Sequence, residues 1–502
     1  MVFINDPNFE NILNALKSQK THQEKVYLVG GMVRDLLLGC KVHDYDVVVD
    51  GDVQRFAKYV ADRLGAAYFL LNAQFQTSRI VWKPQQKDRI IIDLVGMRGN
   101  TIEEDLRDRD FTMNAMALDI ALPDQFIDPM QGGRDIKNKV LRTCSESSLV
   151  NDPVRILRAI RLSVTFSLRL DPNTIHQIKT ASHLVKNITP ERVRDEIFKI
   201  FDLPDPSVAL LLMEHFNLLE KVLPEIERLR DYSPLGRDET GKVWQHTLRV
   251  MKNLRMFEIY LVGNYPAEGA GNLRMGQVVR YLGRYREQLQ QYFSKSLNPD
   301  RSLRSLLYFA ALYHDSGKPE AEKISEVGKL SFVEHDSVAG QLAGERARAL
   351  VLSNDEIKFI TTLVSQHMIL HFFYKDRISP DSRMVYNFFN ACGDSGIGLC
   401  LLSLADTLAG IFEEADEPRW IAELEICTLM MDGYCNHYHE WINPPRWLNG
   451  NEIKALLHIN DGEQIGNWVK ILREETAAEV VFDKQSAEAY LLKSLLESKK
   501  NI

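Results

Sequence analysis

Three acidic residues in the first hundred positions have the type and spacing for chemistry on phosphates. Asp44 and Asp46 stand two positions apart at the start of the β-branched run HDYDVVVD, so a strand places both carboxylates on one face. Asp93 lies inside another apolar run, IIIDLVG, where a lone buried carboxylate would be costly. Neighbouring acids repel unless they share a cation. The pattern therefore predicts a two-metal site for phosphoryl or nucleotidyl transfer.

Paired glycines precede these acids. The apolar run VYLV leads into Gly30 and Gly31 and then into MVRDLLLG, which is predicted to be a short helix that ends at Gly39. Paired glycines let backbone N–H groups approach an anion, and the helix N-terminus adds a favourable partial charge. Arg34 follows one turn later, within reach of a phosphate. A Gly-Gly pair alone is more typical of a tight turn, but the acids that follow favour a phosphate site.

Polar residues also interrupt two later stretches that have helical patterns. Arg109, Asp110 and Asn114 stand out in RDRDFTMNAMALDI. The stretch NDPVRILRAIRL is predicted to be a helix with three polar residues about one turn apart, namely Asp152, Arg155 and Arg158. We expect the first two to present an acceptor and a donor to the edge of a base, and the third to hold a triphosphate. The alternative is an exposed, salt-bridged helix face.

A second constellation lies in the middle of the chain. It consists of histidines and aspartates in helical contexts: His246, His314, Asp315, His335, His367 and Asp406. Imidazole and carboxylate ligands together suit a divalent transition metal or Mg²⁺. Lys318 follows the His-Asp pair by one turn and is placed to contact a phosphate. A single histidine of this kind is more often a core residue, but the ordered set favours metal binding.

Composition limits the class of protein. The chain has 502 residues, of which 45% are hydrophobic and 26% charged, as in globular proteins of several domains. A net charge of −8 argues against a generally basic nucleic-acid coat protein. Residues 151–200 nevertheless contain nine Lys or Arg and only five acids, which favours a local site for a phosphate backbone.

Cysteine spacing and the apolar runs of the sequence bear on the cellular compartment of the protein. The six cysteines form no C-x-x-C pair, so neither a zinc ribbon nor a redox pair is expected, and scattered thiols suit a reducing cytosol. The N-terminal residues show no signal peptide, and no apolar run reaches membrane-spanning length. We therefore expect a cytoplasmic protein without a membrane partner.

Element patterns change along the chain. Strands are predicted from Val26, over 47–50 and over 89–96, whereas helical patterns such as VRILRAIRL and PERVRDEIFKIF dominate after about residue 151. Residues 231–242 and 263–272 are predicted loops. Trp447 and Trp468 have the spacing of core residues of a helical C-terminal segment.

Five ordered motifs carry a resemblance to a known family. GGMVRD, DYD, RDFTMNAMA, DPVRILRAIR and ITPERVRDEI resemble, in that order, the class II tRNA nucleotidyltransferases. That family includes CCA-adding enzymes, relatives that add only CC or A, and bacterial poly(A) polymerases. The resemblance implies an α+β fold, in which a polymerase β-like nucleotidyltransferase head with a mixed sheet precedes all-helical parts. The implied domains are the head (1–145), an RNA-binding neck (146–235), an HD domain (236–412) and a helical tail (413–502).

The resemblance also implies roles. Asp44 and Asp46 would bind two Mg²⁺ ions and Asp93 would be the third acid, in a reaction that joins CTP or ATP to the 3′ end of tRNA. The nucleotide-binding residues would be Gly30, Gly31, Arg34, Arg109, Asp110, Asn114, Asp152, Arg155 and Arg158. Asp152 and Arg155 match the template that reads the base.

The histidine set resembles the HD metal-dependent phosphohydrolase domain. By that resemblance, the core ligands of a divalent metal would be His246, His314, Asp315 and Asp406. His335 and His367 match the additional ligands of members that hold a second metal. Some tRNA nucleotidyltransferases use such a domain as a phosphatase or a cyclic phosphodiesterase.

Three departures from the family pattern bear on the activity. Asn151 stands where the template motif usually has Glu, Asp108 stands where an arginine usually precedes Arg109, and the loop between Asp93 and the RDFT motif is nearly absent. We expect addition of C, C and A to tRNA, with CC-only or A-only addition as rivals because of the short loop. Poly(A) polymerase is a further alternative, and hydrolysis by the HD domain as the main activity is one of another class. The expected partners are tRNA, CTP and ATP but not DNA, and no oligomeric state is indicated.

Overall fold

The structure is a computed structural model, and it divides into two compact units. It describes residues 7–17, 25–40, 42, 44–72, 76–84, 89–122, 126–234, 242–263, 272–299, 301–324, 330–375, 381–410 and 417–500. One unit comprises residues 1–192 and 212–218, and the other comprises residues 193–211 and 219–502. Most of the two predicted loops, at 235–241 and 264–271, lies outside the described residues.

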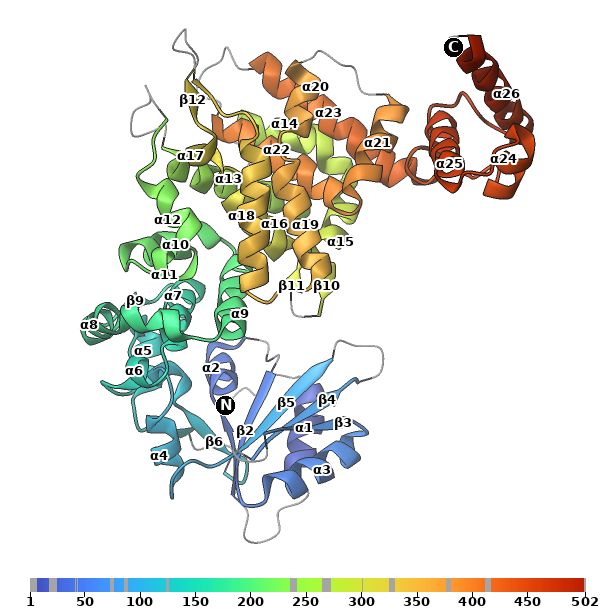
Figure 1. Cartoon of the computed structure of the whole chain (residues 1–502). Helices are drawn as coiled ribbons and strands as arrows, with labels where there is room; N and C mark the ends of the chain where they lie inside the picture. Colours follow the sequence, from blue (N-terminus) through green and yellow to red (C-terminus); the bar gives the residue numbers. More distant parts are fainter. Residues whose placement is uncertain are drawn as a thin grey trace. The chain divides into compact units, whose positions relative to one another are not determined.

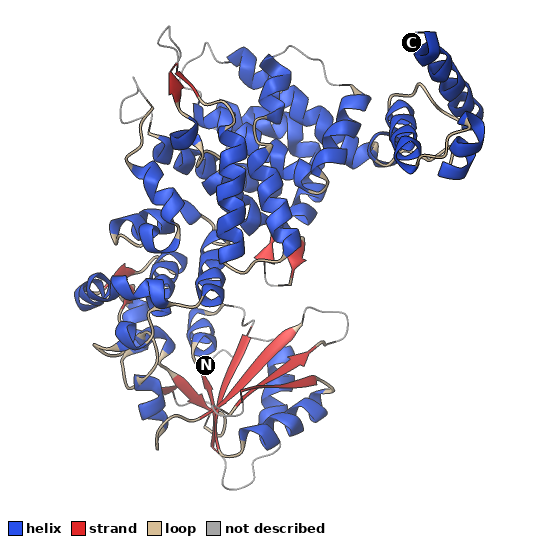
Figure 2. Ribbon diagram, in the orientation of Figure 1, coloured by secondary structure: helices blue, strands red, loops and turns tan. Residues whose placement is uncertain are grey.

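A seven-stranded mixed sheet is the centre of the first unit (Figures 1 and 2). The strand order is β3-β4-β5-β2-β1-β6-β7. Strands β2 and β5 are parallel, and the other neighbours are antiparallel, so the predicted mixed sheet is confirmed. The strands are β1 (Lys25–Val29), β2 (Asp44–Asp50), β3 (Ala67–Asn72), β4 (Thr77–Trp82), β5 (Ile90–Gly96), β6 (Ala117–Asp119) and β7 (Phe126–Ile127).

Alternation along the strands separates two hydrophobic clusters. Helices α1 (Pro7–Lys17) and α3 (Val53–Leu64) bury their apolar sides with Val47 and Val49 of β2. Val48 faces the other way and packs in a second cluster with α4 (Ile102–Arg107). Because Asp44 and Asp46 share the parity of Val48, they lie on the face away from α1 and α3.

Of two sequence predictions for segments next to β1 in the structure, one is confirmed and the other is wrong. The helix after the paired glycines is α2 (Gly31–Leu38), and Gly39 ends it in the left-handed region at φ 69°, as expected. The helical pattern predicted for 107–120 was wrong. Residues 112–114 form one 3₁₀ turn (η1), and β6 follows directly. Pairing of β6 with β1 satisfies backbone groups along an edge of β1, and this tertiary gain outweighs the local helical pattern.

Short helices follow the sheet. The predicted helices at VRILRAIRL and PERVRDEIFKIF are α7 and α9, and both are confirmed. The elements of this stretch are α5 (Gly132–Lys137), β8 (Val140–Leu141), α6 (Ser148–Asn151), α7 (Val154–Thr165), β9 (Arg169–Leu170), α8 (Pro172–Ala181), η2 (Ser182–Asn187) and α9 (Pro190–Phe201).

The described part of the second unit is almost entirely helical. Helix α18 packs on α19, and α13 packs on α22. The elements up to residue 331 are α10 (Pro206–His215), α11 (Leu219–Val222), α12 (Pro224–Arg230), α13 (Val243–Phe257), η4 (Glu258–Val262), α14 (Leu273–Leu282), η6 (Gly283–Tyr285), α15 (Arg286–Ser294), β10 (Ser296–Asn298), β11 (Arg301–Ser302), α16 (Leu303–Tyr313), α17 (Lys318–Ala321), β12 (Lys323–Ile324) and β13 (Leu330–Ser331). The later ones are α18 (His335–Ala349), α19 (Asn354–Ser365), α20 (Ile369–Lys375), α21 (Ser382–Cys392), α22 (Ser395–Gly410), α23 (Glu417–Asn436), η8 (Tyr438–Ile442), α24 (Gly450–Leu457), α25 (Gly462–Ala477) and α26 (Lys484–Lys500).

The last three helices have a hydrophobic cluster of their own. Leu448, Ile453 and Leu491 are buried in it, and Trp447 and Trp468 pack against it as predicted. Among the described residues, no single helix is long and apolar enough to cross a membrane. Helices α21 and α22 reach that length and composition only together, and they are bent by 104°.

Candidate functional sites

The three acids of the head meet on neighbouring parallel strands. Asp46 of β2 and Asp93 of β5 are direct register partners, and Asp44 precedes Asp46 on the same face of β2. Asp44 is exposed, and the other two are partly exposed, so the face is open to a cation. Burial raises the pKa of Asp46 to about 6. The charges of Asp93 and Asp44 add to this, although Arg109 opposes it.

The glycine turn lies directly against this group. Gly30 has a φ of 76°, a backbone conformation that residues other than glycine rarely adopt. A Cβ at this position would lie 3.0 Å from Oδ2 of Asp46 and 3.2 Å from Nη1 of Arg109. A Cβ on Gly31 would lie 3.0 Å from Nη2 of Arg34. The two glycines therefore keep backbone close to both the acid and the two guanidinium groups.

Four predicted nucleotide-binding residues form one connected chain of hydrogen bonds. Arg34 donates through Nη1 to Oδ1 of Asn114 at 2.7 Å, and Nδ2 of Asn114 donates to Oδ1 of Asp110 at 3.1 Å. Nη1 of Arg158 donates to Oδ2 of Asp110 at 3.1 Å. Burial alone would raise the pKa of Asp110. The charge of Arg158 and the hydrogen bonds from Arg158 and Asn114 outweigh this effect, so the pKa of Asp110 lies below its usual value. The network presents two fixed arginines beside the acid face.

Arg155 has a different environment from the one predicted. Its Nη atoms donate to the carbonyl oxygens of Arg109 at 3.2 Å and Asp108 at 3.0 Å, and to Oγ of Ser148 at 2.9 Å. Its Nε lies 3.7 Å from Oδ2 of Asp152. In this structure Arg155 therefore fixes the backbone that carries Arg109, and its contact with Asp152 is the longer one.

Asp152 is held by a residue that the sequence did not single out. Oδ2 of Asp152 accepts from Nη2 of Arg192 at 2.7 Å, whereas its Oδ1 is buried and has no hydrogen-bond partner. Asn151, in place of the usual Glu, donates to Oγ of Ser147 at 3.2 Å. The acceptor that the sequence predicts for a base is thus present, but the residue that orients it, Arg192, belongs to α9.

The second constellation comes together from several helices. Two groups have ligand atoms within 4.8 Å of one another, and Asp315 belongs to both. These groups are His246, His314 and Asp315, and Asp315, His335 and His367. Asp406 joins the first, because its Oδ1 lies 2.7 Å from Nε2 of His246 and 3.7 Å from Nε2 of His314. All six predicted residues are therefore brought together.

Backbone carbonyls orient three of the histidines. Nδ1 of His314, His335 and His367 lies 2.7, 2.8 and 2.7 Å from the carbonyl oxygen three residues earlier, so Nδ1 donates to the backbone and Nε2 is directed into the cluster. Nε2 of His314 is buried without a hydrogen-bond partner, and Nε2 of His335 and His367 face each other at 3.3 Å. Imidazole nitrogens gathered around a carboxylate are a donor set that fits divalent cations. Burial lowers the pKa of His367 to about 3, and the charge on His314 adds to this, so His367 is neutral as a ligand must be.

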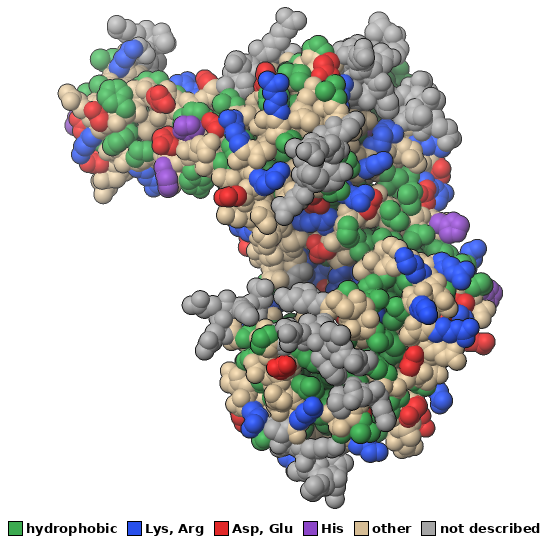
Figure 3. All heavy atoms as spheres, turned by 180° about the vertical axis from the view of Figure 1, so that it is seen from behind, with side chains coloured by type: hydrophobic (Ala, Val, Ile, Leu, Met, Phe, Trp, Pro, Cys, Tyr) green, Lys and Arg blue, Asp and Glu red, His purple; other side chains and the backbone are tan. Residues whose placement is uncertain are grey.

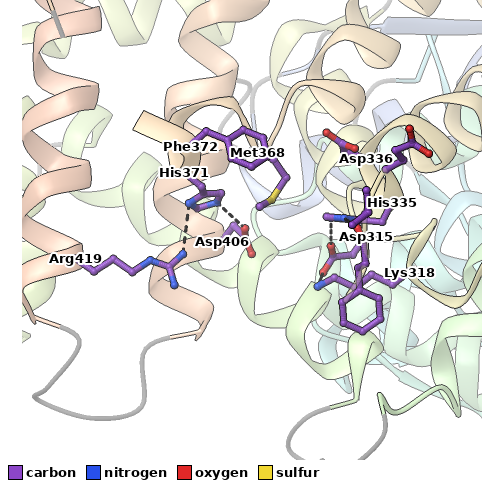
Figure 4. Close-up of a pocket in the computed structure, with 12 residues that line it drawn as sticks. Asp315, Lys318, His335, Asp336, Met368, His371, Phe372, Asp406 and Arg419 are labelled. Atoms are coloured by element: carbon purple, nitrogen blue, oxygen red, sulfur yellow. Dashed lines mark hydrogen bonds and ion pairs between the residues drawn. The ribbon is translucent and has the colours of Figure 1, made fainter. Parts of the chain in front are cut away.

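A pocket of 490 Å³ opens onto Asp315, His335 and Asp406 of this cluster (Figure 4). Lys318 lies on one side, with its Nζ 2.5 Å from Oδ2 of Asp315. Arg419 lies on the other side, beside His371. The remaining wall includes Phe332 and Phe372. Two cations and an apolar wall around acidic ligands suit an organic phosphate.

Comparison with known proteins assigns the family. The family described as "Poly A polymerase head domain" matches residues 26–142, and the one described as "Probable RNA and SrmB- binding site of polymerase A" matches residues 167–229. The A-adding tRNA nucleotidyltransferase of Deinococcus radiodurans is 30% identical over 471 residues, which cover 92% of this chain and 94% of that protein. This chain belongs to the class II tRNA nucleotidyltransferase family.

Other tRNA nucleotidyltransferases and their structures agree with this assignment. The CC-adding enzyme of Geobacter sulfurreducens is 26% identical over 475 residues, covering 94% of this chain and 92% of that protein. The structure of the Thermotoga maritima CCA-adding enzyme complexed with tRNA aligns with a TM-score of 0.56 at 22% identity, over 98% of this chain and 96% of that one. This likeness supports the fold. Membership of this family implies the use of a divalent metal, and the grouped histidines and aspartates offer ligand atoms for one.

Three residues near the two sites of this tRNA nucleotidyltransferase were missed from the sequence. Arg79 of β4 donates to both oxygens of Asp93, at 2.7 and 2.8 Å. His371 contacts Oδ2 of Asp406 at 3.0 Å, and Arg192 contacts Asp152. For Arg79 the available signal was its place in an alternating strand, TSRIVW, and for Arg192 it was the ITPERVRDEI motif.

Basic residues are numerous in the part of the nucleotidyltransferase that follows the head. Arg169, Lys179 and Lys186 are exposed there. The space-filling view shows blue Lys and Arg side chains over the part that carries α7 and α8 (Figure 3). This surface fits the phosphate backbone that the sequence predicts for 151–200.

Proposed function

We propose that the chain adds CMP and AMP from CTP and ATP to the 3′ end of tRNA, with Asp44 and Asp46 holding two Mg²⁺ ions. The observation that carries this proposal is the register of Asp46 with Asp93 on parallel strands, which concentrates carboxylates on one open face. Carboxylate oxygens are the ligands that Mg²⁺ prefers. Ions bound there would activate the 3′-hydroxyl and neutralise the departing pyrophosphate.

The remaining head residues bind and orient the nucleotide in this proposal. The backbone at Gly30 and Gly31 and the arginines of the Arg34–Asn114–Asp110–Arg158 network hold the phosphates and ribose. Oδ1 of Asp152 accepts a hydrogen bond from the exocyclic amine that cytosine and adenine share. Uracil has a carbonyl at the matching position, so it would leave this buried acceptor unpaired.

Primer extension tests the proposal directly. The substrates are tRNAs that lack the last three, two or one nucleotides of the CCA end, incubated with CTP, ATP or both, and the products are sequenced. We expect CCA to be completed on all three substrates, and the double variant D44A/D46A to incorporate nothing. No incorporation by the wild-type enzyme, or full activity of the double variant, would refute the assignment.

The same assay decides between the related activities. An A-adding and a CC-adding enzyme are both similar to this chain over most of its length, and the loop before the RDFT motif is short. Extension only of tRNA lacking the last nucleotide would show A addition, and arrest after two residues would show CC addition. Continued addition of A would show a poly(A) polymerase.

A second activity is favoured by the histidine cluster. We propose that the HD domain is a metal-dependent phosphohydrolase, because Asp315 is shared by two groups of closely spaced ligand atoms, and backbone carbonyls orient His314 and His335 with Nε2 toward it. The core ligands would be His246, His314, Asp315 and Asp406, with His335 and His367 for a second metal. We expect Mn²⁺ or Mg²⁺ to support hydrolysis of p-nitrophenyl phosphate or its bis ester, and D315A to remove it. Failure of the wild-type protein to bind either metal would refute this proposal.

The domain boundaries and the partners complete the proposal. The head would comprise residues 1–145, the neck 146–235, the HD domain 236–412 and the tail 413–502. The exposed basic residues after the head support tRNA binding by the neck, and the tail would hold the tRNA body. We place the enzyme in the cytoplasm, with tRNA, CTP and ATP as partners and neither DNA nor a membrane among them.

A further inference from the structure

Arg192 lies in the first turn of α9, and its guanidinium contacts the acid proposed to read the base. Its Nη2 donates to Oδ2 of Asp152 at 2.7 Å. Its backbone N–H donates to the carbonyl of Thr189 at 3.1 Å, which fixes the start of the helix. Arg155 approaches Asp152 only to 3.7 Å, because its Nη atoms are occupied by backbone carbonyls. The shortest cationic contact of Asp152 therefore comes from α9.

The two oxygens of Asp152 have different surroundings. Oδ2 is occupied by Arg192, whereas Oδ1 is buried and has no partner. A buried acceptor without a donor is costly unless a ligand supplies one. Because one oxygen is fixed, the direction of the other is fixed as well. Oδ1 is thus the atom that an exocyclic amine would meet.

We propose that Arg192 is a positioning residue for base selection, which orients the Asp152 carboxylate so that Oδ1 faces the exocyclic amine of CTP or ATP. This inference rests on the proposed template role of Asp152. The planar guanidinium fork fixes a carboxylate more firmly than an ammonium group does. The side chain of Arg192 is 51% exposed and that of Asp152 is 25% exposed, so the pair contributes little to folding. Its loss affects nucleotide choice instead.

Kinetics of full-length variants test this role. R192A, D152A and the double variant are compared on truncated tRNA with CTP, ATP and UTP. R192A is expected to raise KM for the accepted nucleotide about tenfold and to lower its selectivity over UTP about tenfold, since one directed hydrogen bond is lost. The values of kcat and of KM for tRNA stay near those of the wild type. R192K restores part of the selectivity, because it keeps the charge but not the fork.

Control variants distinguish the role of Arg192 from the proposed template role of Asp152, on which it rests. E191Q, at the adjacent exposed position, keeps wild-type selectivity. The double variant is no worse than D152A, because Arg192 acts through Asp152. Wild-type selectivity in R192A beside a defect in D152A would overturn the role of Arg192 alone, as would additive defects in the double variant or a rise only in KM for tRNA. Wild-type selectivity in D152A would overturn the template role itself.

Discussion

At residue 30 the backbone has a conformation that only glycine adopts easily, and the side chains of Asp46 and Arg109 occupy the space beside it. The φ of 76° is combined with a Cβ position 3.0 Å from Oδ2 of Asp46. Gly39 has a similar φ of 69°, but a Cβ there would meet nothing within 4 Å. Gly30 therefore combines a positive φ with crowding by the acid site, whereas Gly39 has a positive φ, in the left-handed region, without crowding.

G30A is expected to lower nucleotide incorporation by at least about tenfold, because the new methyl group displaces Asp46 or Arg109. G39A serves as the matched control. It also places an alanine at a positive φ, here in the left-handed region at ψ 21°, which costs about 1 kcal/mol, and a Cβ there has no neighbour to displace. Incorporation rates and thermal unfolding of both variants are measured. Equal activity of G30A and G39A would contradict the close approach at residue 30.

At the scale of elements, Gly317 allows α18 to pack closely against the turn that follows His314 and Asp315. A Cβ on Gly317 would lie 2.2 Å from the carbonyl oxygen of His335 and 2.7 Å from the backbone nitrogen of Ala339. Both atoms belong to the backbone of α18, so the helix itself must move. The position of His335 next to Asp315 thus depends on residue 317.

We expect G317A to weaken metal binding at the histidine cluster by at least about tenfold, since a ligand shifted with α18 no longer meets the ion. Titration calorimetry with Mn²⁺ gives the affinity. G276A, in α14, is the control, because a Cβ there meets nothing within 4 Å. If G317A and G276A bind Mn²⁺ with equal affinity, the close packing of α18 is not needed for the site.

A buried ion pair joins β11 to the start of α19. Arg301 donates to both oxygens of Glu356 at 2.6 and 3.1 Å, and the side chains are 6% and 0% exposed. Burial alone would raise the pKa of Glu356, but hydrogen bonds from Arg301 and Ser353 lower it below its usual 4.5. A carboxyl group with a lowered folded-state pKa stabilises the fold above pH 4.5. This contribution is lost as the pH falls through the folded-state pKa.

E356Q is therefore expected to be less stable by about 3 kcal/mol near pH 7, because it leaves the charge of Arg301 buried without a partner. The midpoint of thermal unfolding is followed by circular dichroism between pH 7 and pH 3. The wild-type midpoint should fall more steeply below pH 4.5 than that of E356Q. Parallel pH profiles would show that Glu356 does not carry this dependence.

At the scale of the whole molecule, each candidate site lies within one compact unit. The acids and the predicted nucleotide-binding residues belong to residues 1–192, and the histidine cluster belongs to residues 219–502. Neither set contains a residue from the other unit. The chemistry of one site thus has no structural need for the ligands of the other.

The two activities should be separable by substitution. D44A/D46A is expected to abolish incorporation and to leave phosphate-ester hydrolysis at its wild-type rate, and D315A is expected to do the reverse. Both assays are run on the same preparations of the full chain. Loss of hydrolysis in the head variant with retained folding would contradict the independence of the sites.

The sequence by itself determined the features that depend on local periodicity. The two-residue spacing of Asp44 and Asp46, the helices at Val154–Thr165 and Pro190–Phe201, and the end of α2 at Gly39 were all predictable. These features arise from neighbours in the chain, whose geometry is set by the strand or helix repeat. The ordered motifs also indicated the family.

Only the tertiary structure decided which distant residues meet. The strand pairing set Asp93 beside Asp46, and it turned the predicted helix at 107–120 into a 3₁₀ turn and a strand. The contact of Arg192 with Asp152 joins residues 40 positions apart, and that of His246 with Asp406 spans 160 positions. No local repeat encodes such contacts, because they depend on how whole elements bury their apolar faces against one another.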